Sequence, residues 1–291
     1  MANNFSSNIT LKVAKTFLKG FESARVLTKQ IDTQLFEGSN SFTPDYGDTI
    51  SVKRPTDFVT IRTSDGDISA ENPSPIIAGK ASATVQDYFT VYLEWQQVDE
   101  ALKMGQLEEL LAPKTRRLVT DLETDYASFM VKNTALLAGT PGTAADTWDD
   151  VAEAGAVMQA HGVPMDADWC YAINPFTQRK LASTQRSLGA GGTAGGLIRT
   201  AHEKATLTDN FAGMRVMACN TLATYTSDAG ADKVGALAST PDATYLTAKD
   251  TMTQSLAVNG FTASMTIKAG EQIQVTGRNR MDLSTRKQIV D

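Results

Sequence analysis

Residues 112–137 read APKTRRLVTDLETDYASFMVKNTALL, and the rest of the chain is organised around this stretch. Apolar side chains recur on one side of a helix over several turns, with polar residues between them: Leu118, Leu122, Tyr126, Phe129, Met130, Leu136 and Leu137. Pro113 suits a first-turn position, and Gly139 with Pro141 marks the end. The pattern predicts one helix over Ala112–Leu137, about 37 Å long at 1.5 Å per residue. A short helix is predicted just before it, at Gln96–Gly105.

Three cations stand near the start of this predicted helix: Lys114, Arg116 and Arg117. The partial positive charge of a helix N-terminus disfavours cations at that place. One interpretation is a basic turn that water solvates. The other is that these side chains face acidic groups on another segment, another subunit or nucleic acid. On the second interpretation all three residues are candidates for subunit contact.

The length, composition and net charge of the chain argue against several classes of protein. A chain of 291 residues is long enough for a sizeable core and for one or two domains. The formal charge of −6, from 27 basic and 33 acidic residues, argues against a dedicated nucleic-acid binder, which is usually strongly basic. Two cysteines are too few for a disulfide framework and suit a reducing compartment. No apolar run approaches the roughly 20 residues that span a bilayer, and residues 1–10 lack the apolar core of a signal peptide.

The N-terminal segment has the pattern of an amphipathic helix from Asn8 to about Leu35. Apolar residues form one edge of this helix, whereas Lys12, Lys15 and Lys19 line the other side. Either the helix packs on its own domain, or it is an arm that docks on a neighbouring molecule. The pattern alone leaves both alternatives open.

Two strands with a long polar tip between them are predicted in residues 40–95. The first is Thr49–Arg54, and the second is Ala83–Trp95, in which apolar and polar residues alternate. These residues are too few to build a core, and an isolated two-stranded ribbon is only marginally stable in water. We therefore expect an extended β-arm that lies across another subunit. Phe89 and Val91, on its apolar face, are candidates for that contact.

Residues 139–225 alternate predicted helices and strands, which is typical of an α/β domain. Thr147 and Asp150 have the spacing of a helix-capping box, and Asn174 followed by Pro175 has the pattern of a second helix start. The predicted elements are, in chain order, a helix that ends at Ala160, a strand at Trp169–Ile173, a helix that runs to about Ala182, and a strand at Arg215–Ala218 that extends towards Ala223.

Small residues and Thr dominate residues 226–291, and short strand-like pieces occur at Ser255–Val258, Thr262–Ile267 and Gln272–Thr276. The last two pieces are joined by Lys268–Glu271, which predicts a hairpin. This region is therefore expected to be a separate small β unit. The sequence ends after a strand-like alternation for which we expect no pairing partner.

Residues that could carry catalysis or bind a ligand form no recognisable motif. The Gly-rich stretch Gly189–Gly196 lacks the Lys of a phosphate-binding loop and is predicted to be a flexible surface loop. The two histidines, His161 and His202, and the two cysteines, Cys170 and Cys219, have none of the paired spacings of a zinc site. We therefore predict no catalytic, cofactor-binding or metal-binding residues, no cofactor and no enzymatic activity.

Four stretches of this sequence resemble major capsid proteins of tailed bacteriophages: KTRRLVTDLETDYA, ADTWDDVAEAGAVM, YAINPFTQRKLA and FAGMRVMACNTLATYT. The order of elements resembles the Hong Kong ninety-seven capsid fold, and most narrowly the coat proteins of short-tailed phages of the Salmonella P-twenty-two type. The resemblance implies an α+β phage capsid fold with five parts. These are an N-terminal arm (1–39), an extended β-arm (40–95), a spine helix with a peripheral domain (96–138), a central α/β domain (139–225) and the start of an inserted β domain (226–291).

The resemblance also implies a structural subunit that self-assembles into pentamers and hexamers of an icosahedral virion capsid in the host bacterial cytoplasm. The implied partners are a scaffolding protein, a portal protein and packaged double-stranded DNA bound without sequence specificity, and no membrane is expected among them. Relatives of this family return from the inserted domain to the central one, so the sequence is expected to be a truncated part of a longer coat protein. Two alternatives are a bacterial nanocompartment shell protein of the same fold, and a soluble α/β binding protein or enzyme built on residues 139–225.

Overall fold

The structure is a computed structural model, and it describes residues 6–31, 47–53, 60–70, 80–92, 107–165, 168–186, 195–228, 233–240, 255–282, 284–285 and 287–289. The chain divides into two compact units. The first unit comprises Met1–Ile31, Thr90–Ser227 and Ile267–Asp291, and the second comprises Asp32–Phe89 and Asp228–Thr266. This division differs from the five parts expected above, whose boundaries stay a prediction.

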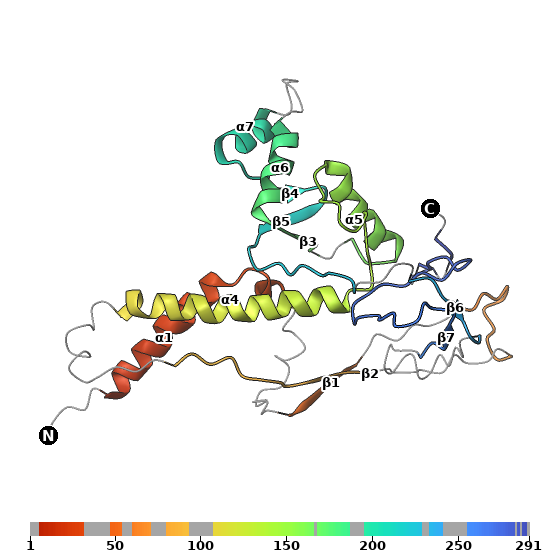
Figure 1. Cartoon of the computed structure of the whole chain (residues 1–291), viewed down its shortest axis with the longest axis horizontal. Helices are drawn as coiled ribbons and strands as arrows, with labels where there is room; N and C mark the ends of the chain where they lie inside the picture. The colour runs from red at the N-terminus through yellow and green to blue at the C-terminus, as the bar shows by residue number, and fades with distance from the viewer. Residues whose placement is uncertain are drawn as a thin grey trace. The chain divides into compact units, whose positions relative to one another are not determined.

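The long helix expected from the sequence is α4, Leu107–Asn133, with 27 residues (Figure 1). It begins more than one turn before the predicted start, so Pro113 lies inside the helix rather than in its first turn. The first turn instead carries Glu108 and Glu109, whose negative charge the helix dipole favours there. The acidic first turn, rather than the proline, therefore marks where this helix starts.

The buried face of α4 also differs from the predicted one. Side chains at intervals of four residues are buried: Leu111, Thr115, Val119, Glu123 and Ala127. The predicted row of Leu118, Leu122 and Tyr126 is only half-buried, and Phe129 is 62% exposed. The helix ends at Asn133 rather than at Leu137, and the Asn133 side-chain amide donates to the Phe129 carbonyl oxygen at 2.8 Å, which satisfies one of the carbonyl groups of the last turn.

Helix α1, Ser6–Ala24, packs across α4 in the first unit (Figure 1). Gly20 of α1 faces Thr115 of α4, and a Cβ atom added at Gly20 would lie 3.4 Å from the Thr115 methyl group. These two small residues therefore set how closely the helices approach. The helix stops at Ala24, well before the predicted end at Leu35, which lies outside the described residues. A short 3-10 helix, η1 (Thr28–Gln30), follows it.

A small mixed sheet lies in the α/β part of the first unit. Its strands, in spatial order, are β3 (Cys170–Ile173), β5 (Met214–Ala218) and β4 (Asn210–Phe211). Strands β3 and β5 run parallel, so the chain needs a crossover between them, whereas β4 and β5 are antiparallel neighbours. Both predicted strands are confirmed, but β5 ends at Ala218 and does not extend to Ala223.

Three helices accompany this sheet: α5 (Trp148–Ala160), α6 (Pro175–Arg186) and α7 (Gly195–Lys204). The capping box is confirmed, and the hydrogen bond from the Thr147 hydroxyl holds the pKa of the Asp150 carboxyl below its usual value. The Asn174 side chain caps α6 by accepting from the Phe176 N–H at 2.7 Å. Helix α7 escapes prediction because its first residues are glycines, which have low helix propensity. The rest of the predicted Gly-rich loop, residues 189–194, lies outside the described residues.

Helices and strands of this part share one apolar core. The buried side chains that form it are Val151, Ile173, Leu181, Ala182, Ala201, Leu207, Phe211 and Met214. Trp169 packs against this core, whereas Trp148 is 53% exposed. The core gives α5, α6, α7 and the sheet fixed positions relative to one another.

The described residues of the second unit contain two short antiparallel ribbons. Strand β1 (Thr49–Lys53) pairs with β2 (Lys80–Thr84), and β6 (Ala236–Leu237) pairs with β7 (Val258–Asn259). The first predicted strand of the β-arm is confirmed, but the second is not a strand over residues 85–92, and residues 93–95 lie outside the described ones. At the end of the β1–β2 ribbon, the Gly47 N–H donates to the Val85 carbonyl at 3.0 Å, and Gly47 has a φ of +88°. The described residues offer no partner strand to residues 86–92, so β2 does not continue into them.

The predicted hairpin around Lys268–Glu271 is wrong, although its turn is present. The Glu271 N–H donates to the Lys268 carbonyl at 3.2 Å, but neither flank is a strand. Gly270, at φ +96°, packs against α4 so tightly that a Cβ atom would lie 2.9 Å from the Lys132 Cα. The turn is therefore held by the end of α4 rather than by paired flanks.

A polar clasp joins the chain leaving the first unit to the chain returning to it. The Tyr225 hydroxyl donates to the Ala269 carbonyl at 3.0 Å, and the Ser227 hydroxyl donates to the Glu271 carboxylate at 3.0 Å. Tyr225 and Ser227 precede residues 228–266 of the second unit, and their two partners follow that segment. The clasp therefore fixes both ends of that segment within the first unit.

The last described residues pair with one another, contrary to the expectation that they have no partner. An antiparallel bridge joins Met281 to Gln288. Between them, hydrogen bonds from the Thr285 hydroxyl and from other groups of the same turn lower the pKa of the Asp282 carboxyl to about 2. Gly162, after α5, lies against this turn, since a Cβ atom there would be 2.7 Å from the Asp282 Oδ1 atom.

The mixture of helices and small sheets agrees with the predicted α+β class. The predicted helix Gln96–Gly105 lies outside the described residues, as does most of the predicted polar tip between the β-arm strands. Among the helices that the structure describes, none is long and apolar enough to cross a bilayer.

Candidate subunit interface

The two β-arm candidates lie on residues 85–92, which follow β2. Phe89 is 44% exposed and Val91 is half-buried, while Tyr88 and Tyr92 are more exposed still. Large aromatic side chains gain the most free energy on burial, so a run of them in water is unfavourable for an isolated chain. Clustered exposure of this kind is typical of an interaction surface.

The three cations of α4 differ in their surroundings. The Arg117 Nε atom pairs with Asp121 one turn along the helix, at 2.9 Å, and the Lys114 ammonium donates to the Tyr92 carbonyl at 3.4 Å. Arg116 is exposed and forms no ion pair within the described residues. Because α4 begins earlier than predicted, all three lie beyond its first turn, and the predicted conflict with the helix dipole does not arise. Their contact with another subunit stays a prediction.

Sequence reasoning missed a buried carboxylate on α4. Glu123 is 3% exposed. Its Oε1 atom accepts hydrogen bonds from the Val26 and Thr28 N–H groups, at 2.7 and 3.1 Å, and from the Thr28 hydroxyl, at 3.0 Å. The thiol of Cys219, just after β5, lies 3.9 Å from Oε2. Glu123 thus joins the segment after α1, helix α4 and the end of the sheet, and we call this contact the Glu123 junction.

Charge and packing both support the Glu123 junction. Backbone N–H groups at the start of η1 favour a negative charge, and hydrogen bonds to a carboxylate are stronger than neutral ones. Around it, Leu27, Ala127 and Cys219 form a small apolar core. The available sequence signal was spacing, because Glu123 lies four residues from both Val119 and Ala127 on the buried row of α4.

A second polar contact fastens η1 to the sheet. The Gln30 side-chain oxygen accepts hydrogen bonds from the Arg215 guanidinium on β5 and from the Cys170 thiol on β3, the latter at 3.5 Å. Arg215 also pairs with Asp168 at 2.9 Å. The segment after α1 is therefore held by α4 and by the sheet of the same chain. Of the two alternatives left open for the N-terminal helix, the structure shows the first: α1 packs on its own chain. Leu18, on the outer face of α1, is 58% exposed.

The residues considered for chemistry are scattered. His161 follows α5 as its C-cap, with Nδ1 2.7 Å from the Val157 carbonyl oxygen, and His202 is exposed on α7. Cys170 and Cys219 are free thiols at opposite ends of the paired strands β3 and β5. Over the described ranges, no group of three or more His, Cys, Asp or Glu residues is placed to hold a metal ion.

Comparison with known proteins gives one consistent family. The family model described as "P22 coat protein - gene protein 5" matches residues 1–290. A major capsid protein of Acyrthosiphon pisum secondary endosymbiont phage 1 is 39% identical over 292 residues, a match that covers 99% of this chain and 67% of that protein. The resemblance to phage coat proteins of the P-twenty-two type is thereby confirmed. The chain belongs to this phage coat protein family and is a structural subunit of a phage capsid, a component of the virion.

Proposed function

We propose that this chain forms the wall of an icosahedral capsid with the Hong Kong ninety-seven fold, as pentamers and hexamers that enclose double-stranded DNA. Its membership in a phage coat protein family supports self-assembly. In this proposal α4 is the spine helix, α1 belongs to the N-terminal arm, and β1, β2 and residues 85–92 belong to the extended β-arm. The α/β part is the central domain, residues 226–291 begin the inserted β domain, and the chain has no catalytic role.

The observation that carries the proposal is the exposed aromatic segment after β2. Tyr88, Phe89 and Tyr92 are exposed on residues 86–92, which the structure assigns to no strand, and the Tyr92 carbonyl accepts from Lys114. Burying apolar surface contributes about 25 cal/mol per Å². Backbone groups outside any strand, as over residues 86–91, can also hydrogen-bond to the edge of another chain. A neighbouring subunit in a shell supplies both.

The proposed partners are a scaffolding protein and a portal protein during assembly in the host bacterial cytoplasm, followed by packaged DNA. The family resemblance is their support. The net charge of −6 suits a wall that does not bind its genome tightly, while exposed cations such as Arg116 adjust local contact. A nanocompartment or a binding protein is not favoured, because the matching family and relative are phage coat proteins.

Replacing Phe89 and Val91 together with Asp tests the proposal. The wild-type chain should form shells or capsomer-like rings in negative-stain micrographs. The double variant should stay soluble and fail to assemble, because charged side chains would have to be buried against the neighbouring subunit.

The matched control replaces Gln272 and Gln274, exposed polar residues of the first unit outside this segment, with Asp. This control adds the same charge and should still assemble. Normal shells from the Phe89 and Val91 variant would refute the role of the β-arm. Discrete monomers from the wild-type chain would refute the shell proposal itself.

A further inference from the structure

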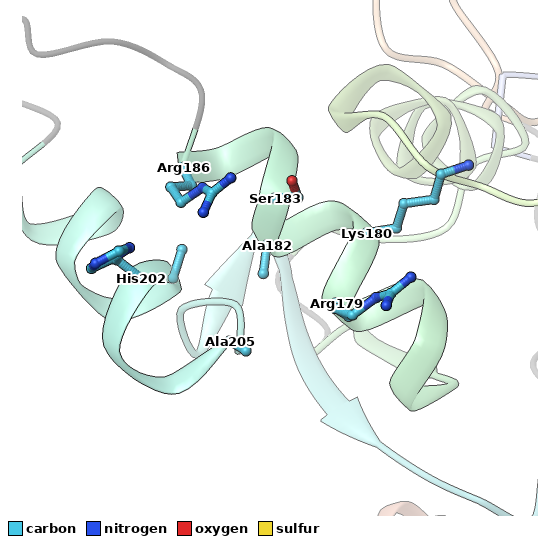
Figure 2. Close-up of a pocket in the computed structure, with 8 residues that line it drawn as sticks. Arg179, Lys180, Ala182, Ser183, Arg186, His202 and Ala205 are labelled. Carbon is cyan, nitrogen blue, oxygen red and sulfur yellow. The ribbon is translucent and has the colours of Figure 1, made fainter.

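A groove between α6 and α7 concentrates positive charge (Figure 2). Its volume is about 340 Å³, and alanines from both helices lie between its polar side chains. Those side chains are Arg179, Lys180, Ser183, Arg186 and His202. Figure 2 shows that Arg186 on α6 and His202 on α7 come from the two helices that flank the groove.

The charge around this groove is opposite to that of the whole chain. Residues Pro175–Lys204 contain five Lys or Arg and one Glu, whereas the chain has 27 Lys or Arg against 33 Asp or Glu. Two local ion pairs engage part of this charge, since Lys180 pairs with Asp146 and Arg199 pairs with Glu203. Arg179 and Arg186 form no ion pair within the described residues.

Helix dipoles account for only some of these cations. Arg186 and His202 lie near the C-terminal ends of their helices, where positive charge is favoured. Arg179 lies in the first half of α6, where the dipole gives no such advantage. Arg186 lies about two turns further along α6, and an acidic ligand bound between the two arginines would relieve their repulsion.

The α/β part also carries an exposed acidic surface, on α5. Asp149 and Glu153 are exposed and four residues apart, so they lie on one face of that helix. Trp148, next to them, is 53% exposed and offers apolar contact area. Four other carboxylates of this part have partners: Asp146, Asp150, Asp168 and Glu203. Asp209, just before β4, is a single exposed carboxylate and does not form a pair on one helix face.

The start of α5 lies close to one side of the groove in the same chain, because Lys180 of the groove pairs with Asp146, just before α5. In Figure 1, α7 and α5 flank α6 from opposite sides. Over the described residues, no ion pair joins Arg179 or Arg186 to Asp149 or Glu153 within one chain, so these groups are available to pair between copies arranged head to tail. A repeated contact of two different surfaces closes into rings when its rotation allows.

We propose that the groove between α6 and α7 binds the acidic face of α5, Asp149 and Glu153, of a second copy of this chain. The inference rests on the proposed function, which requires contacts between copies. Arg side chains bind carboxylates in a two-pronged geometry, which would fix the relative orientation of neighbours. Nucleic-acid phosphates are the less favoured occupant, because the net charge of −6 opposes the approach of a polyanion.

Charge reversal in three variants tests this contact. The first carries Arg179→Glu with Arg186→Glu, the second Asp149→Lys with Glu153→Lys, and the third all four changes. Sedimentation velocity at low salt should show self-association about tenfold weaker in each of the first two, because attraction becomes repulsion. The third variant should recover to within about threefold of wild type, since the charges again complement each other.

Matched controls make the same charge changes elsewhere on exposed residues of the first unit. Arg278→Glu with Arg280→Glu is the control for the groove, and Glu22→Lys with Asp125→Lys is the control for α5. Both should associate like wild type. Thermal unfolding followed by circular dichroism should be unchanged in the groove variant and in both controls, because the altered side chains are exposed. Asp149→Lys should lower the unfolding temperature slightly, because it places a cation in the first turn of α5.

The proposed contact is overturned if the four-residue variant associates no better than the two-residue ones, or if either control weakens association equally. It is also overturned if the groove reversal leaves self-association intact but abolishes retention of a short DNA duplex. Wild-type chains that assemble while every reversal variant assembles equally well would refute this contact alone. Wild-type chains that never associate would refute the proposed shell function as well.

Discussion

Glu123 places an ionisable side chain on the buried side of α4, where three donors from the segment after α1 meet it. A carboxylate loses favourable hydration on burial, and only strong hydrogen bonds can offset that loss. The Glu123 junction supplies such bonds from two N–H groups and one hydroxyl. Those N–H groups would themselves be left unpaired without the carboxylate.

We expect Glu123→Ala to lower the free energy of unfolding by about 3 kcal/mol, because buried donors lose their acceptor. Glu123→Gln should cost less, since the amide oxygen can still accept. Urea denaturation followed by circular dichroism measures both. Glu22→Ala, on an exposed position of α1, is the control and should change stability by less than about 0.5 kcal/mol. Equal losses for Glu123→Ala and the control would show that the junction does not hold η1.

Residues whose role is local could be predicted from the sequence, and residues whose role is long-range could not. Thr147, Asp150 and Asn174 were identified as caps, because their partners lie within a few positions. Glu123 was missed, because its donors lie 95 to 97 positions away in the sequence. Only the fold brings those groups together.

At the scale of elements, the crossing of α1 over α4 depends on one small contact. Thr115 donates its hydroxyl to the Leu111 carbonyl at 3.0 Å, and its methyl group then faces Gly20 across the interface. This arrangement lets two backbones approach without a cavity between them. The contact fixes how α1 lies on α4.

Gly20→Ala should change stability by less than about 1 kcal/mol, because gained helix propensity offsets a tight methyl contact. Gly20→Leu should lower stability by about 1 to 3 kcal/mol through overpacking, and should expose α1 to limited proteolysis. Thermal unfolding and digestion with trypsin measure these two effects. Ala14→Leu adds the same side chain at an exposed position of α1 and should leave both unchanged. If Gly20→Leu behaves like Ala14→Leu, the two helices do not pack at this point.

Helices and strands were predictable where the signal lies within the element itself. The predictions failed where pairing with another segment decides the structure. Periodicity and caps located α4, α5 and α6, although α4 was displaced because its start depends on the acidic first turn. The predicted strand Ala83–Trp95 had correct alternation but no partner beyond Val85. The predicted hairpin at Lys268–Glu271 failed because α4 binds its turn.

At the scale of the whole molecule, negative net charge coexists with local clusters of cations. The cluster on α4 is partly engaged, since Arg117 pairs with Asp121 and Lys114 donates to a carbonyl. Arg116 is therefore the member best placed to act between molecules. The resemblance to a phage coat protein family, by contrast, was inferred from the order and composition of the predicted elements along the chain. That inference needs no knowledge of contacts between them.

Changing Lys114, Arg116 and Arg117 together to Ala should make assembly less sensitive to salt, because the contacts that we propose for them across a subunit boundary would be screened by ions. Arg116→Ala alone should reproduce most of this effect, and Arg62→Ala, an exposed cation of the second unit, should not. Light scattering across a sodium chloride series gives the slope. If assembly of the triple variant depends on salt concentration as strongly as that of wild type, these cations are solvated by water and make no contact between subunits.

The polar clasp formed by Tyr225 and Ser227 has a consequence for how this protein can vary. With both ends of residues 228–266 tied down, that segment is a closed excursion from the first unit. Each doubling of a tethered segment's length costs only about 0.6 kcal/mol in closure entropy. The segment can therefore change in length while α4 and the sheet keep their positions, and such a change would alter the second unit, which residues 228–266 form together with residues 32–89. A foreign domain inserted within residues 228–266 should therefore leave the fold of the first unit intact, as long as the clasp is kept.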